Sequence, residues 1–146
     1  IIYNETLRDR VCAVSNKTHY NEMNVLSMHA LIGAYQPQGY EWVDELNQVL
    51  AGNIEYFCNY VDEHFEGVSY SRPQGTYMVF LDCTEWCREH GRDIQWLLDE
   101  GARVGVGYQD GRPFHGPCHI RVNLALPLSR VREAGDRLDR YVFNAR

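Results

Sequence analysis

The amino-acid sequence predicts an α/β protein with α+β character, in which a small mixed sheet of about four strands packs against helices and is preceded by a long helix. Two observations support this fold class. In the first half of the chain, apolar residues recur at helical spacing over three long segments. In the second half, short apolar runs bounded by glycine, proline and aspartate alternate with further helical segments.

Composition limits the class of protein. The chain has 146 residues, 45% hydrophobic and 23% charged, as expected for one globular domain over 1–146. Its net charge of −6 argues against binding to a nucleic-acid backbone. The longest uninterrupted apolar run, from Tyr77 to Leu81, is far too short to span a membrane. We therefore predict no nucleic-acid partner and no membrane partner.

Three helices are predicted at the start of the chain. The segment 5–14 follows an asparagine suited to capping a helix. The segment 21–35 has apolar residues on most of its faces, so we expect it to be buried or packed against another surface, and to be ended by Pro37 and Gly39. The segment 41–65 has the clearest periodicity and predicts a helix of roughly 35 Å.

The remaining elements alternate. Apolar runs between turn residues predict strands at 68–70, 76–81, 104–108 and 120–126. Asp93 is predicted to cap a helix that Gly101 closes, and Ser129 is predicted to cap the final helix.

The cysteines and histidines predict no metal site. Five cysteines in a chain that needs no disulfides indicate free thiols and a cytoplasmic protein. Cys83 and Cys87 have three residues between them instead of the usual two, and no second pair follows. His115, Cys118 and His119 are residue types that bind zinc, but the glycine and proline among them are typical of a loop. Their role is left open.

The strand at 120–126 carries the most informative polar residues. Side chains alternate along a strand, so Arg121 and Asn123 share one face, and the apolar residues at the alternate positions of the segment share the other. A guanidinium in this setting needs a partner, because an unpaired charge is costly to bury. Two interpretations follow. Either Arg121 forms an internal ion pair or lies on an exposed sheet face, or it binds a carboxylate through two parallel hydrogen bonds.

Ordered motifs resemble the class I/II, fold-type I aminotransferases that depend on pyridoxal phosphate (PLP). The segment 73–82 resembles the Pro-x-Gly-Thr-Tyr strand of this family, and 121–127 resembles its Arg-x-Asn strand. The segments 42–46 and 52–53 are similar to the cystathionine β-lyase-like (C–S lyase) branch. The resemblance covers nearly the whole chain, beginning at Asn4.

The resemblance implies that the chain is the C-terminal part of a longer, homodimeric enzyme and contains its small domain. Residues 1–35 would connect it to a missing large domain that holds PLP and the Schiff-base lysine, upstream of Ile1. Ile1-Ile2 looks like the end of a severed strand. Lys17 is not followed by the glycine-rich segment that follows the family's lysine, so it is predicted to be an exposed lysine. The fragment alone is predicted to be inactive and not to bind PLP.

The resemblance also implies a substrate site. Arg121 would bind the α-carboxylate of an amino-acid substrate, and Asn123 would support it. Four further residues are candidates to line the cleft: Gly75, Thr76, Tyr77 and Tyr108. For Tyr108, packing is the alternative.

The implied reaction is an α,β-elimination on sulfur amino acids that yields pyruvate and ammonia. An aminotransferase would use the same arginine, so it stays open as an alternative. Two other classes are an aminotransferase-like effector domain of a transcription regulator and a stand-alone carboxylate-binding module. The sequence upstream would identify the regulator, and amino-acid binding by this piece alone would identify the module.

Overall fold

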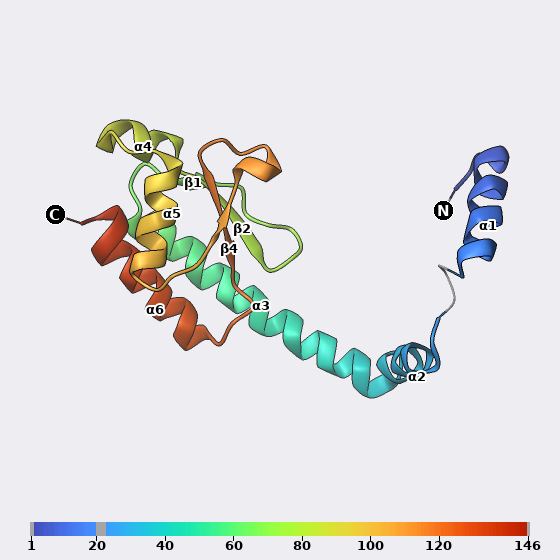
Figure 1. Ribbon diagram of the computed structural model, residues 1–146. Coiled ribbons are helices and arrows are strands. Elements are labelled where there is room, and N and C mark those ends of the chain that lie inside the picture. The colour runs from blue at the N-terminus through green and yellow to red at the C-terminus, as the bar shows by residue number, and fades with distance from the viewer. Residues whose placement is uncertain (1, 20–22, 146) are drawn as a thin grey trace. The chain divides into compact units, whose positions relative to one another are not determined.

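The computed structural model describes residues 2–19 and 23–145, and it divides the chain into two units (Figure 1). The first unit is residues 1–44 and the second is residues 45–146. The boundary therefore falls inside the long helix α3 (Pro37–His64). No helix in the described ranges is both long and apolar enough to cross a membrane.

The first unit begins with two helices, α1 (Glu5–Thr18) and α2 (Val25–Ala34). Each follows an asparagine whose side-chain oxygen accepts a hydrogen bond, 2.9 Å long, from a backbone N–H in the first turn. Both predicted helices are confirmed, with shifted ends. Asn21, the predicted start of the second, lies outside the described residues, as does Ile1 of the predicted strand end.

The turn between α2 and α3 differs from the prediction. Pro37 lies beyond the end of α2, as predicted, but it also opens α3, because its fixed φ suits the first turn of a helix. Gly39 lies in that first turn and passes very close to α2. A Cβ on Gly39 would lie 2.0 Å from the carbonyl oxygen of Ala34. Glycine at this position therefore permits the sharp change of direction.

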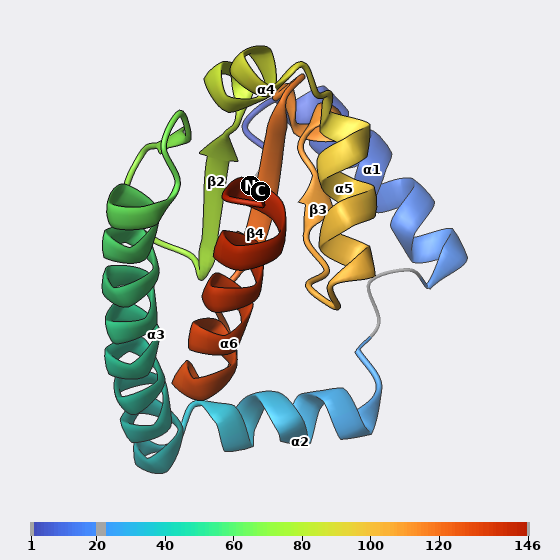
Figure 2. The same cartoon turned by 90° about the vertical axis from the view of Figure 1, so that its left-hand side faces the viewer.

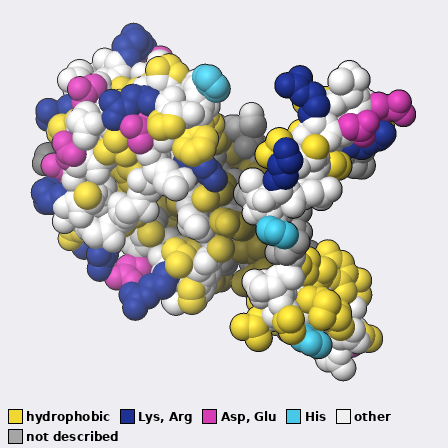
Figure 3. All heavy atoms as spheres, turned by 45° about the vertical axis from the view of Figure 1, so that its right-hand side comes forward, with side chains coloured by type: hydrophobic (Ala, Val, Ile, Leu, Met, Phe, Trp, Pro, Cys, Tyr) yellow, Lys and Arg dark blue, Asp and Glu magenta, His cyan; other side chains and the backbone are white. Residues whose placement is uncertain are grey.

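α2 is apolar around its whole circumference. None of its side chains is buried, and Leu26 is 82% exposed. Figure 3 shows hydrophobic side chains gathered over this helix. The sequence predicts that this segment is buried or packed against another surface, and its own unit does not bury it.

The second unit contains the rest of α3 and the sheet. Its other elements are β1 (Ser69–Tyr70), β2 (Met78–Asp82), α4 (Thr84–His90), α5 (Ile94–Arg103), β3 (Gln109–Asp110), the 3-10 helix η1 (Arg112–Phe114), β4 (His119–Asn123), α6 (Leu128–Leu138) and the π-helical turn η2 (Asp139–Phe143). The strands form one sheet in the order β1-β2-β4-β3. Every neighbouring pair is antiparallel, so the fold class is confirmed but the sheet is not mixed as predicted.

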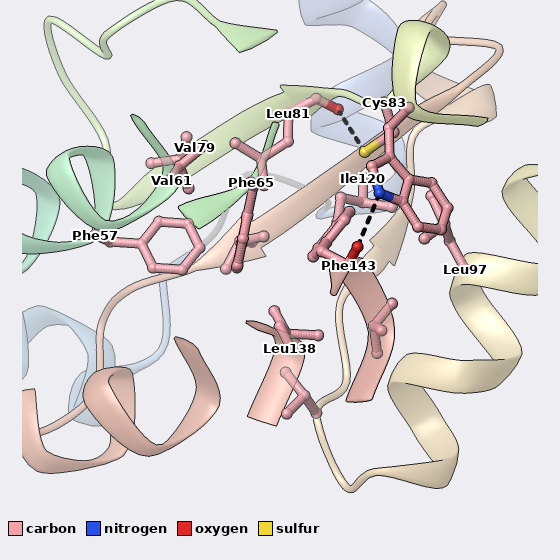
Figure 4. Packing of buried hydrophobic residues seen from close by; sticks show 14 of the residues in the cluster. Phe57, Val61, Phe65, Val79, Leu81, Cys83, Leu97, Ile120, Leu138 and Phe143 are labelled. Atoms are coloured by element: carbon pink, nitrogen blue, oxygen red, sulfur yellow. Dashed lines mark hydrogen bonds between the residues drawn. The ribbon is translucent and has the colours of Figure 1, made fainter. Parts of the chain in front are cut away.

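Helices cover one face of this sheet. Figure 2 shows α5 and α6 in front of the strands and the second half of α3 beside β2. Alternate residues of the two central strands point into this layer, among them Leu81 and Ile120, which are fully buried. Phe65 stacks on Phe143 within it, with 4.3 Å between ring centroids (Figure 4). The residues between these alternate positions are left for the opposite face.

The region of α5 combines a confirmed cap with two corrections. Asp93 caps the helix as predicted, its Oδ1 accepting a hydrogen bond from the Trp96 N–H at 2.8 Å. Gly101 does not close the helix but lies inside it, where a Cβ would come within 2.5 Å of the Tyr108 ring. The predicted strand at 104–108 is wrong, because the chain leaves α5 there and turns toward β3.

Three other boundaries differ. α4 is not predicted from the sequence, because its seven residues are too few to show a helical repeat of apolar residues. Pro127 is the residue before α6, and Ser129 lies in its first turn without capping it. The strand predicted over 120–126 ends at Asn123.

Asn53 joins α3 to the end of β4. It is the buried polar residue of the described core, and its Nδ2 donates hydrogen bonds to the carbonyl oxygens of Leu124 at 2.9 Å and Leu126 at 2.8 Å. We expect Asn53→Ala to lower the free energy of unfolding by about 1–3 kcal/mol, because it leaves both carbonyls without their donor. Urea denaturation measures the effect. Asn59→Ala, an exposed asparagine on the same helix, is the control and should change stability little. Equal values for the two variants would contradict the proposed tie.

Candidate functional site

Arg121 lies in the centre of β4 on the face that the helices do not cover. Its neighbours along the strand, Ile120 and Val122, are buried in the core, while Arg121 is half-buried and Asn123 is exposed. Across the sheet Arg121 is paired with Phe80 of β2 and Gln109 of β3. The alternation predicted for this strand is therefore confirmed.

The guanidinium of Arg121 lies against an aromatic ring. Its Cζ is 4.5 Å from the centroid of the Phe114 ring, which η1 places over this face of the sheet. In the described part of the chain, no carboxylate forms an ion pair with Arg121 and no group accepts a hydrogen bond from it. Within residues 2–19 and 23–145, the structure therefore contains no internal ion pair of Arg121 of the kind that the sequence left open.

Asn123 makes a local turn contact. Its Oδ1 accepts a hydrogen bond from the backbone N–H of Ala125 at 2.8 Å, which helps to end the strand. It also lines a cavity of about 380 Å³ beside α6, which sequence reasoning misses because it depends on packing. The amide nitrogen of Asn123 donates no hydrogen bond to any described residue, so it is available to another partner.

Gly75, Thr76 and Tyr77 lie together in the loop before β2. With neighbouring loop residues they line a groove of about 500 Å³ against α3, of which Arg121 is not a part. Thr76 has a φ of 67°, in the left-handed region that a β-branched residue rarely adopts. The Tyr77 carbonyl then accepts a hydrogen bond from the Leu124 N–H at 2.9 Å, which joins this loop to the end of β4.

Tyr108 packs on the helical side of the sheet. Its hydroxyl donates a hydrogen bond to the carbonyl of Leu97 in α5, and burial raises its pKa. Packing is the role that the sequence analysis gives for Tyr108 as the alternative to lining the cleft.

The cysteine and histidine residues within 2–19 and 23–145 do not gather into a group that could hold a metal ion. No group of metal-binding side chains is found among the residues that the structure describes. The described cysteines are free thiols. Burial raises the pKa of Cys87 to about 12, and a hydrogen bond with Cys118 acts in the same direction, so this thiol stays protonated at neutral pH.

The two histidines of the loop before β4 differ. His115 is exposed, with a φ of 63°. The His119 ring packs at a tilt against the Phe80 ring, with 4.6 Å between ring centroids, and its Nε2 lies 3.7 Å from the carboxylate of Asp82. Sequence reasoning misses Phe114 altogether; the signal was an aromatic residue in a glycine-bounded loop seven residues before the arginine.

The sequence and the fold of the chain are similar to those of known proteins. A Mycobacterium leprae protein named "putative cystathionine beta-lyase" is 34% identical over 124 residues, which are 74% of this chain and 30% of that protein. Among solved structures, a "PLP-bound putative aminotransferase" from Clostridium difficile 630 matches with a TM-score of 0.82 and 22% identity, over 95% of this chain and 35% of its own. The chain is a relative of the cystathionine β-lyase-like PLP enzymes.

A third match agrees with this relationship. The PLP-bound C–S lyase from Staphylococcus hominis has a TM-score of 0.78 and 24% identity, over 95% of this chain and 36% of that one. No family model matches the sequence. The chain thus has the fold of the PLP enzymes and spans about a third of the length of the relatives it matches.

The single lysine of this chain does not lie in a buried pocket. A lysine that holds PLP needs a pocket that lowers its pKa. Lys17 is the chain's single lysine, and it is exposed in the last turn of α1, in the first unit. Arg121 belongs to the second unit. The chemistry that these residues can supply is the binding of an anion.

Proposed function

We propose that this chain is the C-terminal, small-domain part of a longer PLP-dependent C–S lyase, and that Arg121 binds the α-carboxylate of its amino-acid substrate. The observation that supports this most is that Arg121, in the middle of a strand on the face opposite α5 and α6, makes no hydrogen bond or ion pair with any residue that the structure describes. The similarity to proteins named as cystathionine beta-lyases supports the choice of reaction.

The contribution of this chain is orientation. A guanidinium presents two parallel N–H donors that match the two oxygens of a carboxylate. Because β4 is a central strand paired on both sides, Arg121 is anchored on a rigid element. Asn123, two residues on, would direct its amide N–H toward the same anion. Holding the carboxylate fixes how the rest of the amino acid is presented.

The cofactor belongs to the part of the protein that this chain lacks in our proposal. PLP, when bound, supplies an electron sink for a carbanion. We propose that residues upstream hold it, that residues 1–35 lead from them into this chain, and that the whole enzyme is a homodimer.

The test is an assay of the longer protein. Supplied with PLP and cystathionine but no keto acid, it is expected to release pyruvate and ammonia continuously. An aminotransferase, the second candidate, is favoured by the Clostridium difficile neighbour. It would need an added keto acid to accept the amino group, and it would convert cystathionine into the corresponding keto acid without releasing pyruvate or ammonia. Turnover that depends strictly on a keto acid would therefore overturn the lyase proposal in favour of the aminotransferase.

A further inference from the structure

We propose that Phe114 is a positioning residue, which holds the guanidinium of Arg121 in the orientation that presents its edge to a carboxylate. This inference rests on the role of Arg121 proposed above. It starts from one contact, the 4.5 Å between the Arg121 Cζ and the centroid of the Phe114 ring.

The loop that carries Phe114 is tied to the sheet by hydrogen bonds. The Gly111 N–H donates to the carbonyl of His119 at 2.9 Å, and the Gly116 N–H donates to the carbonyl of Gly111 at 3.0 Å. At the entrance of the loop, the carboxylate of Asp110 accepts from the backbone N–H of Arg112 at 2.9 Å. These bonds close the loop on both sides of the phenyl ring.

Two glycines allow the loop to lie directly on the strands. A Cβ on Gly111 would lie 2.4 Å from the carbonyl oxygen of His119, and one on Gly116 would lie 2.5 Å from Cζ of Phe80. No other residue type fits such distances without displacement of the loop. Phe80 is also the cross-strand partner of Arg121. The loop is therefore seated on the same patch of sheet as the arginine.

The phenyl ring lies close enough to the Arg121 guanidinium to attract it. A cation over a ring is attracted to the face of the ring, while the N–H groups of a guanidinium point outward in its own plane. Phe114 is 46% exposed, so the core does not require it. An exposed aromatic side chain, on a loop built this tightly, stabilises one orientation of the arginine before the substrate arrives.

The experiment uses the longer enzyme and four variants: Phe114→Ala, Phe114→Leu, Phe114→Tyr and Arg121→Ala. Each is assayed with S-methyl-L-cysteine and with its carboxamide, which lacks the charge. We expect Phe114→Ala and Phe114→Leu to lower kcat/KM for the acid by about 3- to 30-fold, mainly through KM, and to leave the carboxamide unaffected. Phe114→Tyr keeps the ring face and should restore the wild-type preference.

A second readout is independent of turnover. Nitrogen-15 NMR of the arginine Nε–H groups should show a ring-current shift of Arg121 in the wild type and in Phe114→Tyr, and loss of that shift in Phe114→Leu. Tyr141→Ala is the matched control, because Tyr141 is also 46% exposed and lies 5.9 Å from the guanidinium of Arg140. It should behave as the wild type.

The outcomes separate the two proposals. If Arg121→Ala keeps the preference for the acid, the carboxylate role itself fails. If Arg121→Ala loses the preference while Phe114→Leu keeps it, the role of Phe114 is overturned and that of Arg121 stands. An equal loss for the acid and the carboxamide in Phe114→Leu would also overturn it, because the ring would then support the fold of the site and not the arginine.

Discussion

Replacing Arg121 with alanine in the longer enzyme is expected to lower kcat/KM for cystathionine by about 10²- to 10⁴-fold. The loss has two parts, since the substrate carboxylate loses a charged partner with two hydrogen bonds, and the reacting bond loses its orientation. Arg121 makes no ion pair within the described residues, so its removal should leave the fold intact. Steady-state kinetics and a thermal melt on the same preparation measure both quantities.

Two variants sharpen this result. Arg121→Lys keeps the charge but loses the planar pair of donors, so we expect activity between that of the wild type and that of Arg121→Ala. Arg92→Ala is the control: Arg92 is an exposed arginine whose guanidinium lies 4.8 Å from the ring of Trp96, away from β4. Unchanged kinetics in Arg121→Ala, or an equal loss in Arg92→Ala, would remove the assignment.

Truncating Trp86 should have the largest effect on stability. The side chain is 2% exposed, its Nε1–H donates a hydrogen bond to the carbonyl of Phe143 at 3.2 Å, and its ring meets the Phe143 ring edge-on. We expect Trp86→Ala to lower the free energy of unfolding of this chain by about 3–5 kcal/mol, through the cavity and the unpaired carbonyl that it leaves.

Urea denaturation of the chain tests this expectation. Trp42→Ala is the control, because that tryptophan is 63% exposed in α3 and should cost about 0.5 kcal/mol or less. A loss for Trp86→Ala no larger than that for Trp42→Ala would show that α4 is not part of the cooperative core. Comparing the denaturant slopes separates local from global unfolding.

The strand that carries Arg121 was predictable because its information is local. Alternation with a period of two assigns Arg121 and Asn123 to one face whatever the neighbouring strands are, and the structure agrees. The same holds for the cap at Asp93, where one side chain bonds to a backbone group three residues away. The long helix α3 was predictable from periodicity repeated over many turns.

Contacts between distant residues were not predictable in this way. The contact of Phe114 with Arg121 depends on a loop whose path is set by two close approaches, Gly111 on His119 and Gly116 on Phe80, and neither has a local pattern. α4 and the loop after α5 were misread for the same reason, because short segments take their conformation from what they pack against.

The apolar surface around α2 determines how this polypeptide behaves in solution when it is produced alone. Because this helix has no polar face, Leu26 and its neighbours form an exposed apolar surface that can bind the same surface of another chain in solution. Protein concentration, and not temperature, then determines whether the free chain self-associates. We expect dilute samples to stay monomeric with the sheet unit folded. We expect concentrated samples to self-associate through the ten residues of α2, which take no part in the sheet.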